Sequence, residues 1–342
     1  MTSPTASTAS KRRCSDPETM TDHDTDTSVL MRPLNWLETQ SEAVFAYVLL
    51  APAFLLLGVV ALYPLVRTFQ FSLLADQVSA PAPLGGVVGL DNYADLLTGR
   101  ALLSQQFVDP TFETPLLQQA LFVTVAFAVL SVLFETLLGF GQALVLDQDF
   151  RGRRWVRVSI IIPYAIPIVI QAMIFFLIFN PTIGFGTEFM QSIGAFGSNP
   201  LASSSDSFLI VLVADIWKTS AFMALLILAG LQSVDRGLYD VAKVSGASAW
   251  QQFKYITLPL VAPALLVAML FRTMDAMRIY GLIDATAGCQ TVPSLSCLVI
   301  TSVFGTRRWA TASAVAFLTA VVIGLLVAVY LFTLRNREVG MT

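Results

Sequence analysis

Six long apolar runs constrain what this chain can fold into more than any other feature. Each run is near or above the roughly 20 residues that an α-helix requires to cross the hydrocarbon core of a bilayer. Only 13% of the 342 residues are charged, whereas a soluble protein carries about a quarter. We therefore predict an all-α integral membrane protein with six transmembrane helices, at residues 43–66, 117–146, 158–179, 207–231, 263–284 and 311–334.

The first 40 residues differ in composition from the rest of the chain. They are rich in Thr, Ser and Asp, and they hold little that could form a core. Such a composition predicts a disordered tail. The basic cluster Lys11-Arg12-Arg13 is followed by polar residues, so the tail does not resemble a signal peptide. Residues 41–342 are then the transmembrane domain.

The positive charges predict the orientation of the spans. If the N-terminus is inside, the inner segments carry 13 of the 20 lysines and arginines. The strongest contribution is the short loop RGRRWVR at 151–157. Cytoplasmic loops are enriched in Lys and Arg, so we predict that both termini and residues 232–262 lie in the cytoplasm.

Composition also excludes several chemistries. The sequence contains no Gly-Lys pair and hence no Walker A phosphate loop, so any ATP that drives this protein must bind to another chain. One histidine and three cysteines leave little material for a transition-metal site. The net charge of −3 does not indicate a nucleic-acid partner. Motifs of membrane-embedded enzymes such as HExxH and GxSxG are missing from the sequence.

The stretch YDVAKVSGASAWQQFKYITLPLVAP at 239–263 is half polar, although apolar runs flank it. It predicts a short helix, a turn at Gly246 and a second short helix N-capped by Ser248. Trp250, Phe253 and Ile256 recur every three residues and form one apolar face. Pro259 and Pro263 are expected to end this element and start the next span. Periodicity alone also fits an interfacial helix without a partner.

Residue identity favours a more specific interpretation. The stretch resembles the EAA loop of permease subunits of binding-protein-dependent ABC importers, through Gly246-Ala247 and the ending LP with a further Pro. It departs from the family where Asp240-Val241-Ala242 replaces Glu-Ala-Ala. The segment GLDNY at 89–93 looks like one in sugar permeases, and ADIWKTSAFMALLILAGLQSV and LFRTMDAMRIY look like the maltose and trehalose type.

This resemblance implies the type I importer permease fold in the cytoplasmic (inner) membrane of a prokaryote, and the uptake of a sugar such as trehalose or maltose by ATP-driven alternating access. It also implies partners: an ABC ATPase dimer that holds ATP and magnesium, a second permease, an extracellular solute-binding protein, and lipid around the spans. The permease itself is not an enzyme. Residues 233–262 would be its cytoplasmic coupling loop, with contacts to the ATPase at Asp240, Ala242, Gly246, Ala247, Trp250, Phe253 and Pro259.

Charged residues inside the predicted spans indicate a second site, because ionisable groups in a membrane are costly and face a cavity or a partner. Two helix faces carry them, and the resemblance implies that the sugar contacts lie on these faces, at Asp215, Lys218, Thr219, Phe222, Arg272, Asp275 and Ala276. The alternative is a structural network with ion pairs within each helix, Asp215–Lys218 and Arg272–Asp275–Arg278. Glu135 has no obvious partner and is predicted to be structural.

Three alternatives remain open. Cys289 and Cys297, in a predicted outer loop, form either a disulfide or two free thiols. The cations Lys218, Arg272 and Arg278 also suit a glycerol phosphate as the substrate. The intramembrane acids would suit an ion-coupled secondary transporter, although six spans without a repeat are few for one and the coupling loop would then be unexplained.

Overall fold

The computed structural model describes residues 41–79, 81–98 and 116–339, so the predicted disordered tail lies outside the described residues. The chain divides into two compact units, Met1–Pro64 and Leu65–Thr342. In the described part of the first unit, α2 (Glu42–Leu57) and the π-helical segment η1 (Gly58–Leu62) lead into α3 (Tyr63–Ser72). This continuous apolar helix contains the first predicted span.

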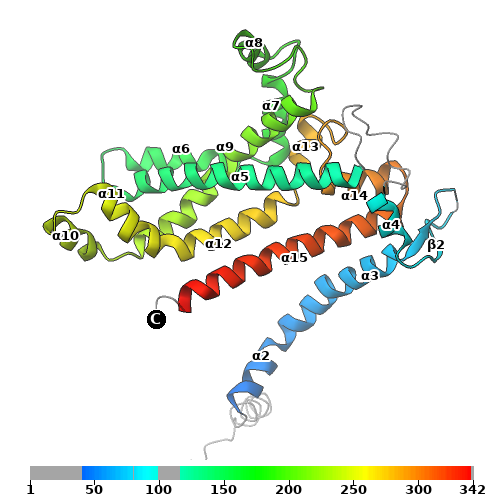
Figure 1. The fold of residues 1–342 in the computed structure, drawn as a ribbon, viewed down its shortest axis with the longest axis horizontal. Coiled ribbons are helices and arrows are strands. Elements are labelled where there is room, and N and C mark those ends of the chain that lie inside the picture. Colours follow the sequence, from blue (N-terminus) through cyan, green and yellow to red (C-terminus); the bar gives the residue numbers. More distant parts are fainter. Residues whose placement is uncertain (1–40, 80, 99–115, 340–342) are drawn as a thin grey trace, which may run out of the picture. The chain divides into compact units, whose positions relative to one another are not determined.

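The second unit is built around three neighbouring helices, α5 (Leu116–Asp147), α9 (Ser204–Gln232) and α12 (Leu258–Ala276), with α15 (Trp309–Val339) beside α12 (Figure 1). The predicted second, fourth and sixth spans are confirmed within a few residues. Small residues let these helices approach closely. A Cβ added to Gly139 of α5 would lie 2.6 Å from the Cβ of Met223 on α9.

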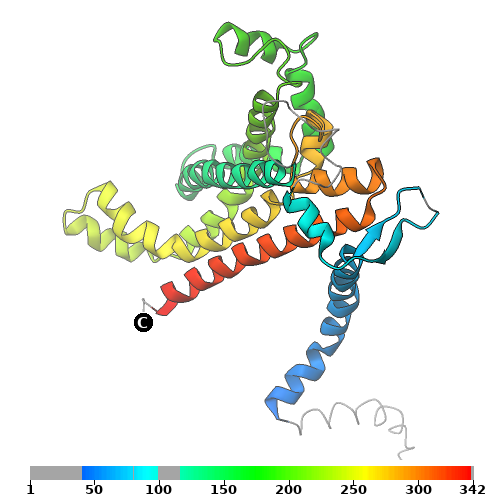
Figure 2. The same cartoon turned by 45° about the vertical axis from the view of Figure 1, so that its right-hand side comes forward.

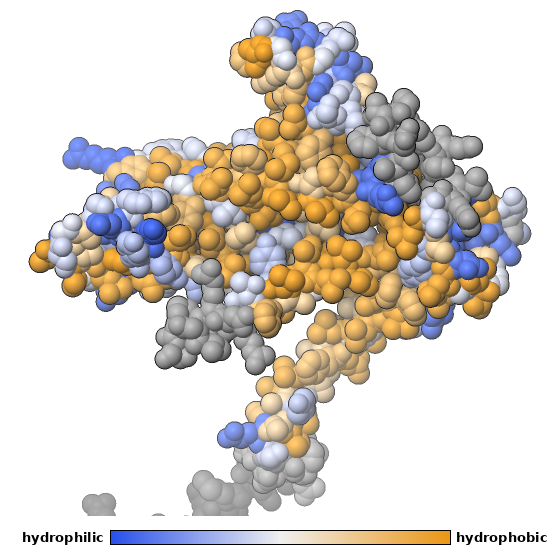
Figure 3. Space-filling view, in the orientation of Figure 1, coloured by the Kyte–Doolittle hydropathy of each residue, from blue (hydrophilic) through white to orange (hydrophobic). Residues whose placement is uncertain are grey.

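Apolar side chains cover much of the visible surface of this bundle (Figure 3). Large residues on the outer faces of α5 and α15, including Phe122, Leu137 and Phe332, are exposed. The buried core is correspondingly thin, with Phe127, Met223 and Ile227 among its largest fully buried side chains. A surface of this kind suits lipid or partner helices, as expected for a protein in a bilayer.

The third predicted span is a bent pair of helices rather than one straight helix. Residues 158–179 are divided between α6 (Arg153–Ala165) and α7 (Ile168–Ile178), which meet at 93°. Ile166 is extended at the break, because a residue that precedes a proline is pushed out of the helical region, and Pro167 follows it. The described residues therefore hold five helices long enough to span, or six spans if this bent pair counts as one.

The fifth predicted span also needs correction. The helix does not end at Pro259: it runs from Ala249 to Ala276 as α11 (Ala249–Gln252), the π-helical segment η3 (Phe253–Thr257) and α12. The proline ring removes one helical N–H and crowds the preceding turn, and the wider π-helical turn directly before Pro259 accommodates this. The chain then leaves the helix at Met277, well before residue 284.

At one end of the second unit, a hairpin of β1 (Leu74–Asp76) and β2 (Leu84–Val87) precedes α4 (Asp91–Thr98). The GLDNY segment fastens these elements together. Asn92 donates from Nδ2 to the carbonyls of Ser72 and Leu74, at 2.8 and 2.7 Å. Asp76 accepts hydrogen bonds from the first turn of α15, including the N–H of Ala310 at 2.7 Å. A carboxylate suits the positive end of a helix.

The remaining short helices are α8 (Phe185–Ser192), α13 (Gly281–Thr286) and α14 (Leu295–Ile300), which continues into the π-helical segment η4 (Thr301–Gly305). Cys289 and Cys297 form a disulfide between α13 and α14, which is one of the two expected states. Helices α13 and α14 lie at the end of the bundle away from α10 (Arg236–Val244) and α11 (Figure 2). This placement agrees with the predicted outer side.

Candidate functional site

A buried ionic cluster joins the three central helices. Arg272 of α12 is 3% exposed and donates from Nε and Nη2 to the two carboxylate oxygens of Glu135 on α5, at 2.5 and 2.7 Å. The same Nη2 donates to Asp215 Oδ2 of α9 at 2.9 Å, and Nη1 donates to Asp275 Oδ2 at 2.7 Å. One guanidinium thus holds carboxylates from all three helices.

Two hydroxyl groups complete this cluster. Thr219 Oγ1 donates to Glu135 Oε1 at 2.6 Å, and Ser131 Oγ donates to Asp215 Oδ2 at 2.7 Å. Buried charges are tolerated when they are paired and their remaining positions are hydrogen-bonded. The fork of the guanidinium matches carboxylate geometry on two sides. The cluster therefore fixes how α5, α9 and α12 lie against one another.

The structure brings most of the predicted site together but changes the role of several members. Glu135, predicted to have no partner, is the fully buried centre of the cluster. The predicted pair of Asp215 with Lys218 is absent from the ion pairs of the described residues: the ammonium donates to the carbonyl of Ile166 at 2.7 Å. Arg278 donates to the carbonyl of Met274. A lone acid in a long apolar run requires a cation, and this signal could have identified Glu135 as a member of an ion pair.

Of the seven predicted sugar contacts, three are buried and three are accessible, and the seventh, Asp215, is held in the cluster with a side chain that is 13% exposed. Thr219, Arg272 and Ala276 lie in the interior of the chain. Asp275, by contrast, has a side chain that is 72% exposed. Lys218 and Phe222 are partly buried beside the bend between α6 and α7, where Phe222 stacks on Tyr164 at 5.9 Å between ring centroids. The side chains of Asp275, Lys218 and Phe222 are accessible to a polar ligand, whereas the buried residues pack beneath them.

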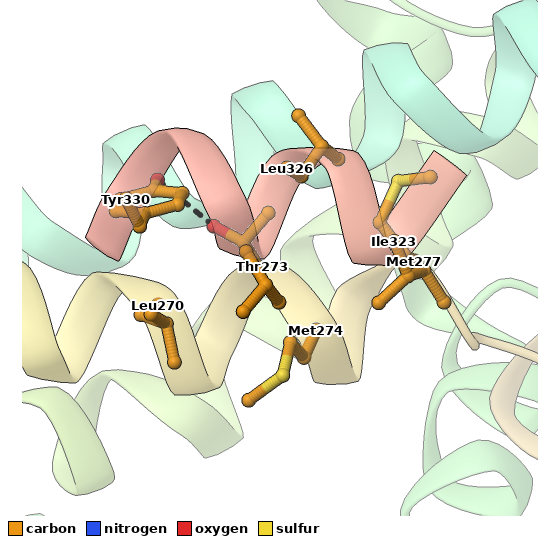
Figure 4. Close-up of a pocket in the computed structure, with 8 residues that line it drawn as sticks. Leu270, Thr273, Met274, Met277, Ile323, Leu326 and Tyr330 are labelled. Carbon is orange, nitrogen blue, oxygen red and sulfur yellow. Dashed lines mark hydrogen bonds between the residues drawn. The ribbon is translucent and has the colours of Figure 1, made fainter. Parts of the chain in front are cut away.

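A second feature of this region is the seam between α12 and α15 (Figure 4). Leu270, Met274 and Leu326 are among the side chains that line it, and the hydroxyls of Thr273 and Tyr330 lie 3.1 Å apart within it. The seam has no room for a water molecule. It is a helix-packing contact rather than a ligand site.

The predicted coupling loop forms a helical hairpin at one end of the bundle (Figure 1). It consists of α10 (Arg236–Val244), a turn, and α11. Gly246 makes the turn with φ +81°, a backbone conformation that side chains disfavour. Ser248 caps α11, and Gln251 reaches back to it in a reciprocal capping box. The expected turn and cap are both confirmed.

The apolar side chains of this hairpin face two ways. Leu238, Val241 and Val244 on α10 are exposed at three-residue spacing, and Trp250 is also exposed. Phe253, expected to anchor a partner, instead packs edge-on against Phe140 of α5 at 5.5 Å. Phe253 is partly buried and also stacks on the exposed Trp250, and sequence periodicity did not identify the stripe on α10.

The other predicted loop residues lie as follows. Asp240 and Lys243, both exposed, form an ion pair of 3.7 Å on α10. Ala242 and Ala247 are half-buried and their backbone closes the turn, since the N–H of Ala247 donates to the carbonyl of Ala242 at 2.9 Å. Pro259 lies in the first turn of α12. The hairpin is thus rigidly built and offers one apolar stripe beside a carboxylate.

Comparison with known proteins shows which family this chain belongs to. Residues 135–339 match the model of the binding-protein-dependent transport system inner membrane component. The chain is 34% identical to the trehalose/maltose transport system permease MalF of Thermococcus litoralis, over 87% of this chain and 96% of that protein. It is also 34% identical to the trehalose transport system permease SugA of Mycobacterium tuberculosis, over 77% and 80% of the two chains.

The fold agrees with these sequence matches. A solved bacterial ABC transporter involved in the import of the acidic polysaccharide alginate superposes with a TM-score of 0.68, covering 91% of this chain and 99% of the other. Its identity of 22% makes this a likeness of fold alone. On the family match, the identities and the shared fold, the chain belongs to the binding-protein-dependent inner membrane components, the multi-pass permease subunits of ABC importers in the cytoplasmic membrane.

Proposed function

We propose that this permease takes up a disaccharide of the trehalose or maltose type by ATP-driven alternating access. The observation that carries the proposal is the 34% identity to a trehalose/maltose permease along 96% of that protein. The accessible residues in and beside the ionic cluster support it, because Asp275, Lys218 and Phe222 offer an acceptor, a donor and a stacking face to a polyol. Asp215 and Asp275 offset the cationic charge of this region, which favours a neutral sugar over a glycerol phosphate.

The proposal assigns the energy source to partner chains. An ABC ATPase dimer would bind ATP and magnesium and dock on α10, where Leu238, Val241 and Val244 form the exposed apolar stripe. Closure of that dimer would move α10 and α11, and η3 would transmit the motion because it continues directly into α12. Arg272 of α12 would then carry the motion to α5 and α9 through the ionic cluster. A second permease and an extracellular binding protein complete the importer.

The experiment that tests this function combines purification with uptake. The tagged chain is gently purified from its host membranes, and its partners are identified by mass spectrometry. We expect an ATPase with a Walker motif, a second permease and a solute-binding protein, and we expect deletion of this chain to abolish uptake of radiolabelled trehalose or maltose. Recovery of the chain alone or as a homodimer would favour an ion-coupled transporter. Selective loss of glycerol phosphate uptake would favour that substrate.

Substitution Asp275→Asn tests the accessible edge of the proposed sugar site. We expect the KM for the sugar to rise about tenfold, which corresponds to about 1.4 kcal/mol, because a charge-assisted hydrogen bond becomes a neutral one. The protein should fold normally, since the Asp275 side chain is largely exposed. The measurement is initial uptake rate against sugar concentration. The control is Asp284→Asn, because Asp284 contacts Tyr280 outside the cluster. An unchanged KM in Asp275→Asn would show that Asp275 is not part of the sugar site.

A further inference from the structure

A cavity lined by arginine lies at the end of the bundle that also carries α10. Arg153, Arg154 and Arg157 line it from the beginning of α6, and Gln232 lines it from the end of α9. Its volume is about 380 Å³. The ion pair between Arg236 and Asp147, at 2.9 Å, ties the start of α10 to the end of α5 at this same end. The cavity shares no lining residue with the ionic cluster.

The positive charge in this cavity is incompletely paired. Arg153 is paired with Asp149 at 2.6 Å, whereas no acid pairs with Arg154 or Arg157 among the residues that the structure describes. The Nε atoms of Arg153 and Arg157 are buried and, within the described part of the chain, have no hydrogen-bond acceptor. A buried donor without an acceptor is costly. An anion bound by these arginines would supply acceptors that the described residues do not.

The backbone adds to the same requirement. Arg153 is the first residue of α6, and the first turn of this helix contains no acid. Its N-cap is Gly152, which has no side chain to cap the helix, and the N–H groups of Arg153 and Trp155 donate to backbone carbonyls instead. Helix N-termini carry a partial positive charge and favour anions, so arginines are unfavourable neighbours there unless an anion lies between them. The helix end and the arginines thus favour the same ligand.

The surroundings of the cavity indicate where that anion comes from. Trp155, Val158 and Ile162 are exposed and lie at i, i+3 and i+7, so one apolar face of α6 begins beside the arginines. Tryptophan is enriched at the depth of the lipid headgroups, and basic pockets between transmembrane helices bind anionic headgroups. Hydrophilic atoms also gather at this end of the molecule (Figure 3). A ligand with a phosphate head and an apolar tail matches both surfaces.

We propose that this cavity is a binding site for an anionic phospholipid, with the headgroup phosphate held by Arg153, Arg154 and Arg157 and an acyl chain along Trp155, Val158 and Ile162. The guanidinium fork suits phosphate oxygens on two sides. Such a lipid would brace the junction of α6 with α9. The inference is independent of which substrate the permease carries.

Native mass spectrometry of the purified permease complex, titrated with phosphatidylglycerol or phosphatidylcholine, tests this site. We expect the wild type to bind phosphatidylglycerol at least about tenfold more tightly than phosphatidylcholine. We expect the double variant Arg154→Gln with Arg157→Gln to lose about tenfold of that affinity, in line with the strength of basic contacts at a membrane surface. The matched control replaces Arg307 and Arg308, a neighbouring pair at the other end of the second unit, with glutamine.

Several results would overturn the proposal. Wild-type protein with equal affinity for the two lipids would do so without any variant, even if the double variant fails to fold. An equal loss of affinity in the Arg307 and Arg308 control would mean that overall charge, not this cavity, attracts the lipid. Inorganic phosphate that displaces phosphatidylglycerol at equal concentration would identify a free phosphate as the ligand. Arg154→Lys with Arg157→Lys should retain most of the binding, since both charges remain.

Discussion

Substitution Arg272→Met should abolish sugar uptake and lower the free energy of unfolding by about 3 to 5 kcal/mol, the cost of removing one partner from a buried ion pair. The guanidinium makes four hydrogen bonds to Glu135, Asp215 and Asp275. Without it, the fully buried carboxylate of Glu135 keeps only hydroxyl donors, from Thr219 and from Ser131, whose one proton is shared with Asp215. The measurement is the unfolding midpoint in mixed detergent micelles, together with uptake in cells.

The controls separate charge from shape at this position. Arg278→Met removes an exposed arginine from the turn that follows α12 and should leave the unfolding midpoint nearly unchanged. The unfolding midpoint of Arg272→Lys should lie between those of Arg272→Met and Arg278→Met, because a single ammonium cannot reproduce the planar guanidinium fork. Adding Glu135→Gln to Arg272→Met should recover part of the lost stability, since both partners of the buried pair are then neutral. Wild-type stability in Arg272→Met would contradict the structural role of the cluster.

Substitution Gly246→Pro should uncouple ATP hydrolysis from transport, with the sugar imported per ATP falling about tenfold or more. Proline holds φ near −65°, whereas the turn between α10 and α11 requires φ +81° at this residue. A strain of about 1.4 kcal/mol in this turn is enough to shift the equilibrium between its native and altered conformations tenfold. The spans should still fold, because the hairpin lies at the end of the bundle (Figure 1). Uptake and ATPase activity are measured together in proteoliposomes of the assembled importer.

Gly246→Asn is the matched control for this turn. Asparagine visits the left-handed conformation more readily than other residues with a side chain, and a Cβ at this position meets no atom within 4 Å. The asparagine variant should therefore keep most of its coupling. If Gly246→Pro transports sugar normally for each ATP, α10 and α11 are not the coupling element.

Local chemistry explains why parts of this protein were predictable. The long apolar runs at α5, α9 and α15 are helices because only an α-helix lets a single segment pair its own backbone N–H and C=O groups within lipid. The left-handed turn at Gly246 and the cap at Ser248 depend on neighbouring residues alone. The bend of the third run was also predictable, because Pro167 disfavours a helical conformation at Ile166. It was missed because all 22 residues of the run were read as one apolar helix.

The partners of charged and aromatic side chains could not be predicted in this way. The expected pair of Arg272 with Asp275 is present, but Arg272 also binds Glu135, 137 positions away in the chain, and this partner was not predicted. The contact of Phe253 with Phe140 of α5 was not predicted either. Both outcomes depend on which helices become neighbours, which helical periodicity does not encode.

The sequence by itself determined the membrane class, most of the spans, the coupling hairpin with its turn, and the family. These features rest on backbone hydrogen bonding and local conformation, which act over a few residues. The tertiary structure decided the ionic cluster, the division of the predicted sugar contacts into buried and accessible residues, and the arginine cavity between α6 and α9. Each of these requires side chains from separate helices to meet, and burial then selects the charges that must be paired.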